Sequence, residues 1–200
     1  MDEKELASRN FYKYYTSKTT LDATDFEKLL PYFEFKELSH NQLLLRAGEV
    51  CKHFLFVEQG IIQSFSLDSK GGEHILQFAP ENWLMVDRSS MYFGEPSAYY
   101  IKAIEPSVVV YMKPQFLVEA AKLKPDVASF TEISLQRNIY FIQKRVNSLI
   151  AATARERYLE FMELYPDLLL RVPQWMIASY LGITPESLSR VRREIAKESF

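Results

Sequence analysis

The residues best suited to chemistry lie near the C-terminus, where charged side chains recur at helical spacing. A helix turns by about 100° per residue, so charged residues of the segment 185–197 at spacings of four, three and four share one face. They are Glu186, Arg190, Arg193 and Lys197. An Arg can donate two hydrogen bonds to guanine, and a Glu can accept one from cytosine. The segment therefore predicts a helix that reads base edges in DNA.

Short hydroxyl side chains flank this charged face. Ser187 and Ser189 lie beside it, and Arg192 lies nearer the apolar side, where it suits a phosphate contact or an ion pair. The predicted DNA-binding residues are Thr184, Glu186, Ser187, Ser189, Arg190, Arg192, Arg193 and Lys197. The alternative interpretation is a solvated amphipathic helix, because charged faces of this kind are common.

Two helices and a tight turn are needed to position these side chains. The segment 174–181 is typical of a first helix, and Gly182 suits the left-handed conformation that ends it. Thr184 suits the N-cap of the second helix, and Pro185 suits its first turn. Five small or aliphatic residues would form the contact between the helices: Ile177, Ala178, Leu181, Leu188 and Val191. This pattern predicts a helix-turn-helix.

A long helix from about 126 to 150 precedes this motif. Its C-terminal half carries apolar residues at spacings of four, three, four and three, namely Leu135, Ile139, Ile142, Val146 and Leu149. Coiled coils have this spacing, so the helix is predicted to form a homodimer. The alternative is a single buried helix in a monomer. The segment 151–153 after it is predicted to be a hinge.

The first half of the chain has the pattern of short strands between helices. Residues 24–33 and 113–123 read as helices, the first with a capping box at Thr24, and residues 35–112 read as short strands separated by turns. The expected class is α+β: an N-terminal antiparallel β-roll, or jelly roll, with flanking helices, then the long helix and a helical C-terminal domain. The expected domains are a sensor (1–125), the dimerisation helix (126–150) and the DNA-binding domain (151–200).

Composition narrows the class of protein. The net charge of the 200 residues is −2, but residues 184–197 hold four Lys or Arg against two Glu, a net of +2. No apolar run approaches the roughly 20 residues of a membrane helix, and the charged N-terminus lacks a signal peptide, so no membrane partner and a cytoplasmic location are expected. The single Cys51 excludes an intrachain disulfide and an iron–sulfur cluster.

Enzymatic and metal chemistry are not expected. The three histidines, His40, His53 and His74, lack metal-like spacing. A cupin-like enzyme would share the β-roll but would need clustered His and carboxylate ligands. We therefore predict no metal, no cofactor and no enzyme activity.

At this point the order of elements resembles the Crp/Fnr family of bacterial regulators, over about residues 20–200. The segment Val172-Pro173-Gln174-Trp175-Met176-Ile177-Ala178-Ser179-Tyr180-Leu181-Gly182-Ile183-Thr184-Pro185-Glu186-Ser187-Leu188-Ser189-Arg190 resembles the Bacteroidetes-type branch. The resemblance implies a cyclic-nucleotide-binding-like sensor domain and a helix-turn-helix of the winged type. Glu186 and Arg190 match base-reading positions, whereas Pro185 stands where the best-known members carry another base-reading Arg. The wing that follows the recognition helix in many members is expected to be missing.

The sensor half departs from members that bind cyclic AMP. These have a Gly-Glu at a short helix N-terminus and a later Arg-Ser that holds the phosphate, because the cyclic phosphate is a desolvated anion. Gly94 and Glu95 match superficially, but Ser97 stands where Arg is expected. Arg88 or Lys102 are the alternative anchors for an anion. The candidate effector pocket is Trp83, Arg88, Gly94, Glu95, Ser97, Ala98, Tyr100 and Ile142.

The resulting prediction is a homodimeric, sequence-specific regulator of transcription. Its partners would be double-stranded DNA with a near-palindromic site, an unknown small-molecule effector other than cyclic AMP, and as a further candidate RNA polymerase. The alternative is a small-molecule binding module whose helical domain contacts protein instead of DNA. An aromatic cluster is expected to fill the core of the roll, with a ligand pocket as the alternative; it comprises Trp83, Tyr92, Phe93, Tyr99 and Tyr100.

Overall fold

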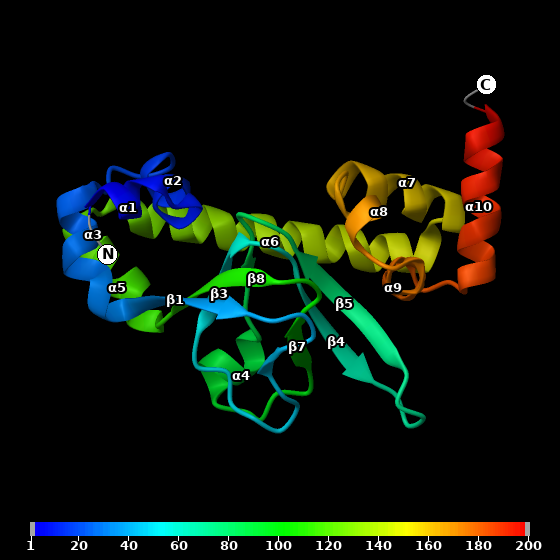
Figure 1. The fold of residues 1–200 in the computed structure, drawn as a ribbon, viewed down its shortest axis with the longest axis horizontal. Coiled ribbons are helices and arrows are strands. Elements are labelled where there is room, and N and C mark those ends of the chain that lie inside the picture. Colours follow the sequence, from blue (N-terminus) through cyan, green and yellow to red (C-terminus); the bar gives the residue numbers. More distant parts are fainter. Residues whose placement is uncertain (1–2, 199–200) are drawn as a thin grey trace. The chain divides into compact units, whose positions relative to one another are not determined.

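The computed structural model describes residues 3–198 and contains two compact units (Figure 1). The first unit holds the chain up to Phe65 and from Phe78 to Gln136. The second holds the hairpin tip Ser66–Gln77 and the chain from Arg137 onward. The mixture of antiparallel sheets and helices confirms the predicted α+β class.

Two four-stranded sheets form the β-roll. Their strand orders are β1-β8-β3-β6 and β2-β7-β4-β5. In the first sheet β8 pairs antiparallel with both β1 and β3, and in the second β7 pairs antiparallel with both β2 and β4. The strands are β1 (Phe33–Leu38), β2 (Leu43–Leu45), β3 (Phe54–Gln59), β4 (Ile62–Leu67), β5 (Glu73–Ala79), β6 (Leu84–Met85), β7 (Tyr100–Ala103) and β8 (Ser107–Met112).

A glycine is required where β3 turns into β4. Gly60 has a φ of +90°, in the left-handed region that side chains disfavour. A Cβ at this position would lie 2.8 Å from Ser107 Cα and 2.2 Å from Ser107 Oγ. The turn therefore depends on glycine for its backbone conformation and for the close approach of β8.

An aromatic core lies between the first sheet and the helices that cover one of its faces. Phe11, Phe26, Phe56 and Phe116 are fully buried, and the rings of Phe11 and Phe56 lie 5.3 Å apart. The helices of this unit are α1 (Glu3–Ser8), α2 (Asn10–Thr16), α3 (Ala23–Leu29), η1 (Leu30–Tyr32), α4 (Arg88–Phe93) and α5 (Pro114–Leu123), followed by the start of α6 (Asp126–Ala151). Burying one such side chain stabilises the folded state by about 1.5–3 kcal/mol, so this cluster is a main source of stability.

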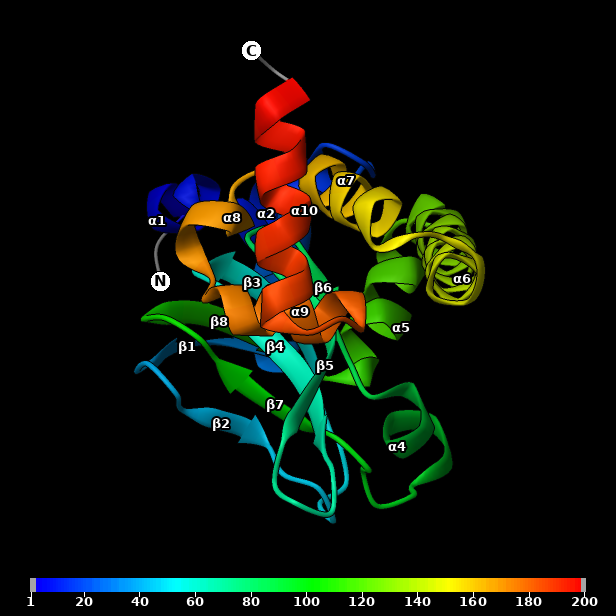
Figure 2. The same cartoon turned by 90° about the vertical axis from the view of Figure 1, so that its right-hand side faces the viewer.

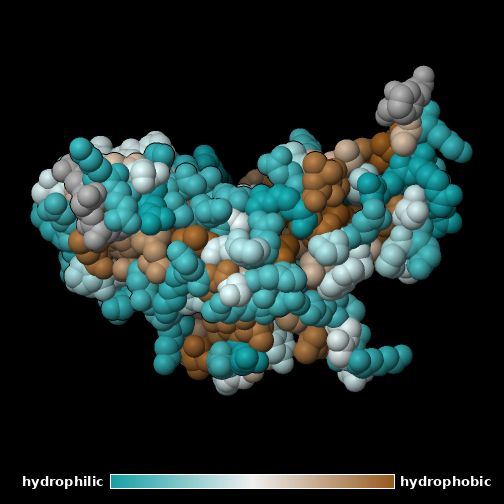
Figure 3. Space-filling view, viewed as in Figure 1, coloured by the Kyte–Doolittle hydropathy of each residue, from teal (hydrophilic) through white to brown (hydrophobic). Residues whose placement is uncertain are grey.

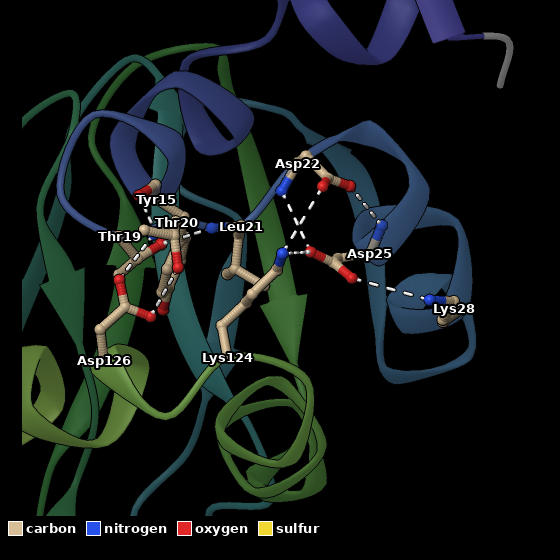
Figure 4. A network of polar contacts seen from close by, with 9 residues as sticks. All are labelled: Tyr15, Thr19, Thr20, Leu21, Asp22, Asp25, Lys28, Lys124 and Asp126. Atoms are coloured by element: carbon tan, nitrogen blue, oxygen red, sulfur yellow. Dashed lines mark hydrogen bonds and ion pairs between the residues drawn. The ribbon is translucent and has the colours of Figure 1, made fainter.

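Polar contacts hold the N-terminal helices to the junction of α5 and α6 (Figure 4). The Thr20 amide donates to Asp126 Oδ2 at 2.7 Å, and Lys124 Nζ lies 3.3 Å from Asp25 Oδ2. The capping box of α3 is formed by Asp22 and Asp25. The prediction of a capping box at Thr24 was therefore wrong by two residues, because Asp22 already accepts a hydrogen bond from the Asp25 amide.

The second unit is helical apart from the hairpin tip. The C-terminal part of α6 leads into α7 (Ala154–Leu164), α8 (Leu168–Arg171), α9 (Gln174–Leu181) and α10 (Pro185–Glu198). Thr153 caps α7 in a capping box with Glu156, so the last residue of the predicted hinge is the N-cap of the next helix. Every strand within residues 3–198 precedes residue 113.

Candidate DNA interface

The turn between α9 and α10 has the local chemistry that the sequence predicts. Gly182 ends α9 with a φ of +65°, and the Ile183 amide donates to the Ala178 carbonyl at 3.0 Å. At the start of α10, the Ser187 amide donates to Thr184 Oγ1 at 3.2 Å. The left-handed C-cap and the Thr N-cap together fix the direction in which α10 leaves the turn.

The back of α10 is apolar and buried. Leu188 is fully buried and Val191 nearly so. On α9, Ile177, Ala178 and Leu181 are buried as well, which confirms the predicted contact between the two helices. An ion pair between Arg155 at the start of α7 and Glu198 on α10 holds the far end of the helix.

The opposite face of α10 is polar and open to solvent. Figure 3 shows hydrophilic side chains along this helix. Glu186, Arg190, Arg193 and Lys197 are all exposed. They line a shallow groove together with Ser187 and with Glu194, an acidic residue that the sequence-based set leaves out. The groove therefore carries both cationic and acidic groups.

Hydrogen bonds at the start of α10 arrange two of the predicted base-reading residues. One guanidinium nitrogen of Arg190 lies 3.5 Å from Ser187 Oγ, which in turn lies 3.3 Å from Thr184 Oγ1. The backbone amide of Glu186 and the Thr184 hydroxyl lower the pKa of the Glu186 carboxyl below its usual range. Glu186 is therefore a carboxylate at neutral pH and can only accept hydrogen bonds. Of the rest of the set, Ser189 is exposed and Arg192 is half-buried, nearer the core.

The hairpin tip between β4 and β5 is attached to α9. Ser179 Oγ donates to the Glu73 carbonyl and accepts from the Ile75 amide, both at 3.0 Å. Arg145 on α6 donates to the carbonyls of Ile75 and Tyr180, at 3.4 Å and 3.1 Å. Figure 2 shows α9 beside β5. Sequence reasoning missed this attachment, because its partners lie 35 to 106 positions apart in the chain.

The predicted dimer face of α6 is exposed. Its five residues have between 37% and 53% of their surface accessible: Leu135, Ile139, Ile142, Val146 and Leu149. This pattern differs from that of a helix buried within one subunit, whose apolar face would be covered. The apolar stripe is therefore accessible on the surface of the single chain.

The segment expected to hold an anion has a different geometry from the predicted one. Gly94 is the left-handed C-cap of α4, so Gly94 and Glu95 do not lie at a helix N-terminus. Asp87 caps the N-terminus instead, and its buried carboxylate accepts hydrogen bonds from the Ser90 amide and, at 2.6 Å, from Ser97 Oγ. The Gly-Glu pair therefore does not occupy the helix N-terminus that the match to cyclic-AMP-binding members implies.

The structure places the remaining candidate pocket residues in different surroundings. Trp83 packs against the core, Arg88 is half-buried on α4, and Ala98 is exposed. Tyr100 stacks on Phe65 with ring centroids 5.2 Å apart. Ile142 belongs to the second unit. The structure thus brings Ser97 to Asp87, and the effector pocket stays a prediction.

The expectation that the aromatic cluster fills the core was wrong for three of its five members. Tyr92 and Phe93 have 60% and 77% of their surface exposed, and Tyr99 has 38%. Tyr92 and Phe93 occupy the last turn of the short helix α4. A helix of six residues can bury only one narrow face, and here Ser90 and Met91 point inward.

Neither a metal site nor a membrane span is present in the described part of the chain. Within residues 3–198, no group of three or more His, Cys, Asp or Glu side chains could hold a metal ion. None of the helices in this range is long and apolar enough to cross a membrane.

Comparison with known proteins agrees with this geometry. Residues 35–122 match the family model of the cyclic nucleotide-binding domain. No curated protein sequence matches the chain. FixK2 from Bradyrhizobium japonicum is similar in structure, with a TM-score of 0.69 and 20% identity over 84% of this chain and 86% of that one.

Two further solved structures share the arrangement. CLP, a c-di-GMP responsive global regulator from Xanthomonas campestris, has a TM-score of 0.67 and 13% identity over 89% of this chain and 93% of that one. A proposed transcriptional regulator of the Crp/Fnr family from Eubacterium rectale has a TM-score of 0.64 and 14% identity, over 93% and 88%. The resemblance recognised in the sequence is thus confirmed, while the Bacteroidetes branch stays a prediction. The chain is thus similar to the cyclic nucleotide-binding domain over residues 35–122, and it shares the fold of these solved structures.

Proposed function

We propose that this protein is a homodimeric transcription regulator that binds DNA through α10. The observation that carries the proposal is the exposed stripe of Glu186, Arg190, Arg193 and Lys197 on a helix whose other face is buried. A recognition helix needs both features, because one side must pack on its own domain and the other must enter the major groove.

Within this stripe, the residues take different roles. Arg190 is proposed to donate to guanine and Glu186 to accept from cytosine, because both lie in the N-terminal half of α10, which enters the groove first. Arg193, Lys197 and the half-buried Arg192 are proposed to contact phosphates. Thr184, Ser187 and Ser189 are proposed to assist, as short donors beside the Arg side chains.

Dimerisation is proposed to use the exposed apolar stripe of α6. Its spacing fits a two-stranded coiled coil, and pairing would cover surface that is costly to leave in water. A dimer would present two α10 helices about one DNA turn, roughly 34 Å, apart, so the DNA site would be nearly palindromic. RNA polymerase remains a predicted further partner, and the cytoplasm the predicted location.

The β-roll is proposed to sense an effector other than cyclic AMP. The segment that holds the cyclic phosphate in related regulators would need a cation, but here Ser97 is bonded to the buried carboxylate of Asp87. A second negative group at this place would be repelled, and no Arg is paired with either residue in the described contacts. This chemistry disfavours any cyclic nucleotide at the segment.

The role of α10 is tested with Arg190→Ala. We expect the variant to lose about 1–3 kcal/mol of discrimination between an enriched DNA site and random DNA. Fluorescence anisotropy with both DNAs measures this loss, and Arg137→Ala, at an exposed position of α6, serves as the control. Unchanged discrimination would remove Arg190 from base reading. Ligand binding without DNA affinity even at low salt would instead favour a module whose helical domain contacts protein.

A further inference from the structure

A second candidate site lies at one end of the β-roll, where β2, the segment 49–53, β3 and β8 meet. It is a cleft of about 530 Å³. Clefts of 300–1,000 Å³ are typical of small-molecule sites. All of its lining residues belong to the first unit, and none belongs to the segment around Asp87 and Ser97.

The lining of this cleft is mainly apolar with a few polar groups. Leu44, Leu45, Val50 and Leu55 provide aliphatic surface. Its polar side chains include Lys52, His53 and Tyr111, which can all donate hydrogen bonds. An apolar wall with a small number of donors is the usual composition of a ligand site.

The rings of the cleft are held in place by their neighbours. The His53 and Tyr111 rings meet edge to face, with centroids 5.5 Å apart. The ammonium of Lys36 lies 4.2 Å from the centroid of the Tyr111 ring. Burial raises the pKa of Tyr111 to about 12, so its hydroxyl stays a neutral donor at physiological pH.

The electrostatic environment of the cleft favours an anion. Burial and then the charge of Lys36 lower the pKa of His53, and Lys113 and Lys52 act in the same direction. Only Glu34 opposes them, and its carboxylate is paired with Lys36 at 2.7 Å. In and around the cleft, three ammonium groups therefore face two carboxylates, Glu34 and Glu49. Glu49, which also lines the cleft, accepts a hydrogen bond from the Arg46 amide.

We propose that this cleft binds a small organic anion with an apolar body, such as a medium-chain or aromatic carboxylate. The apolar body would lie against the leucines, and the carboxylate would face Lys52 and the His53–Tyr111 pair. The role of this ligand as an effector rests on the proposed function as a regulator, whereas its binding does not.

The test is calorimetric titration of the full-length protein, without DNA, with octanoate and with 1-octanol. The two probes share an alkyl chain, and only octanoate carries a charge. We expect octanoate to bind more tightly than octanol. Lys52→Gln should weaken the affinity for octanoate by about fivefold, the typical effect of losing an exposed ion pair, and should change the affinity for octanol little. Lys70→Gln, at an exposed lysine of the hairpin tip, serves as the control and should change neither.

A second variant tests the location. Val50 is 41% exposed, so Val50→Trp can fill the cleft without disturbing the core. We expect it to abolish binding of both probes, with circular dichroism confirming the fold. Equal affinities for octanoate and octanol would overturn the proposal. Binding that persists in Val50→Trp would also overturn it, because the probe would then occupy another apolar surface such as that of α6. Because DNA binding is measured separately, failure here leaves the proposed function standing.

Discussion

The guanidinium of Arg145 lies 3.6 Å from the centre of the Tyr180 ring and donates a hydrogen bond to the carbonyl of the same residue. It also donates to Ile75 on β5, so a single side chain of α6 connects the hairpin tip with the end of α9. Burial lowers the pKa of Arg145, yet an Arg remains charged at any physiological pH. The contact therefore joins a permanent cation to two carbonyls and an aromatic face.

Replacing this cation should loosen the second unit. Arg145→Met keeps an unbranched chain but removes two hydrogen bonds and the stacking on Tyr180, so we expect a loss of about 1–3 kcal/mol in the free energy of unfolding. Urea denaturation measures the change. Arg137→Met, on an exposed stretch of the same helix, should cost far less. Equal effects of the two substitutions would mean that the contact contributes nothing.

Ser179 should control how firmly the hairpin tip is attached. Its hydroxyl satisfies the Glu73 carbonyl and the Ile75 amide, which lie on an edge strand of the second sheet. Ser179→Ala leaves both groups without this partner, so the Ile75 amide should exchange with solvent faster, in line with a cost of about 1–3 kcal/mol. Hydrogen exchange read by mass spectrometry or NMR measures it. Ser129→Ala on an exposed position of α6 should leave the exchange unchanged.

Substitutions at two glycines can distinguish the cost of backbone strain from the cost of a steric clash. Gly60 and Gly48 both have a φ of +90°, but only at Gly60 would a Cβ meet another chain segment. Gly48→Ala should therefore cost about 1–3 kcal/mol from strain alone, and Gly60→Ala should cost about 1–3 kcal/mol more. Thermal unfolding compares them. If the two variants had the same stability, the close approach of Ser107 to Gly60 would contribute nothing to the free energy of unfolding.

A charge placed in the exposed apolar stripe of α6 should disrupt the proposed dimer. Val146 is 50% exposed on α6, and Val146→Glu would place a carboxylate in the proposed seam. We expect the variant to sediment as a monomer and to lose at least about tenfold in DNA affinity, because one half-site contact is lost. Lys144→Glu changes the charge two residues away, off the stripe, and should stay dimeric. A dimeric Val146→Glu protein would place the subunit contact elsewhere.

Local signals explain why the helix-turn-helix could be predicted. Gly182, Thr184 and Pro185 determine the turn through their own backbone and hydroxyl chemistry, and the burial of Leu188 and Val191 follows from helical period. The long helix α6 was equally visible, because its pattern is periodic over many residues. The strands were predicted only as a group, over residues 35–112, because each one is short.

Long-range contacts explain what the sequence could not predict. The carboxylate of Glu58 is buried and accepts from the amides of Asn10 and Phe11, which lie 48 and 47 positions away. Nothing in the local sequence marks it, and a buried carboxylate is usually unexpected. The helix α4 was missed for a different reason: it is six residues long, too short for a helical period to show in the sequence. The cleft beside His53 likewise depends on strands that are distant in sequence.

The most direct test of the central proposal is selection of bound sequences from random DNA fragments by the purified full-length protein, at two salt concentrations. We predict enrichment of an inverted repeat whose half-sites lie about one helical turn apart, with affinity that falls as salt rises because phosphate contacts release counterions. Parallel selections with and without octanoate would separate an absent effector from an absent function. Failure to enrich any sequence in either selection would contradict the account that α10 reads DNA.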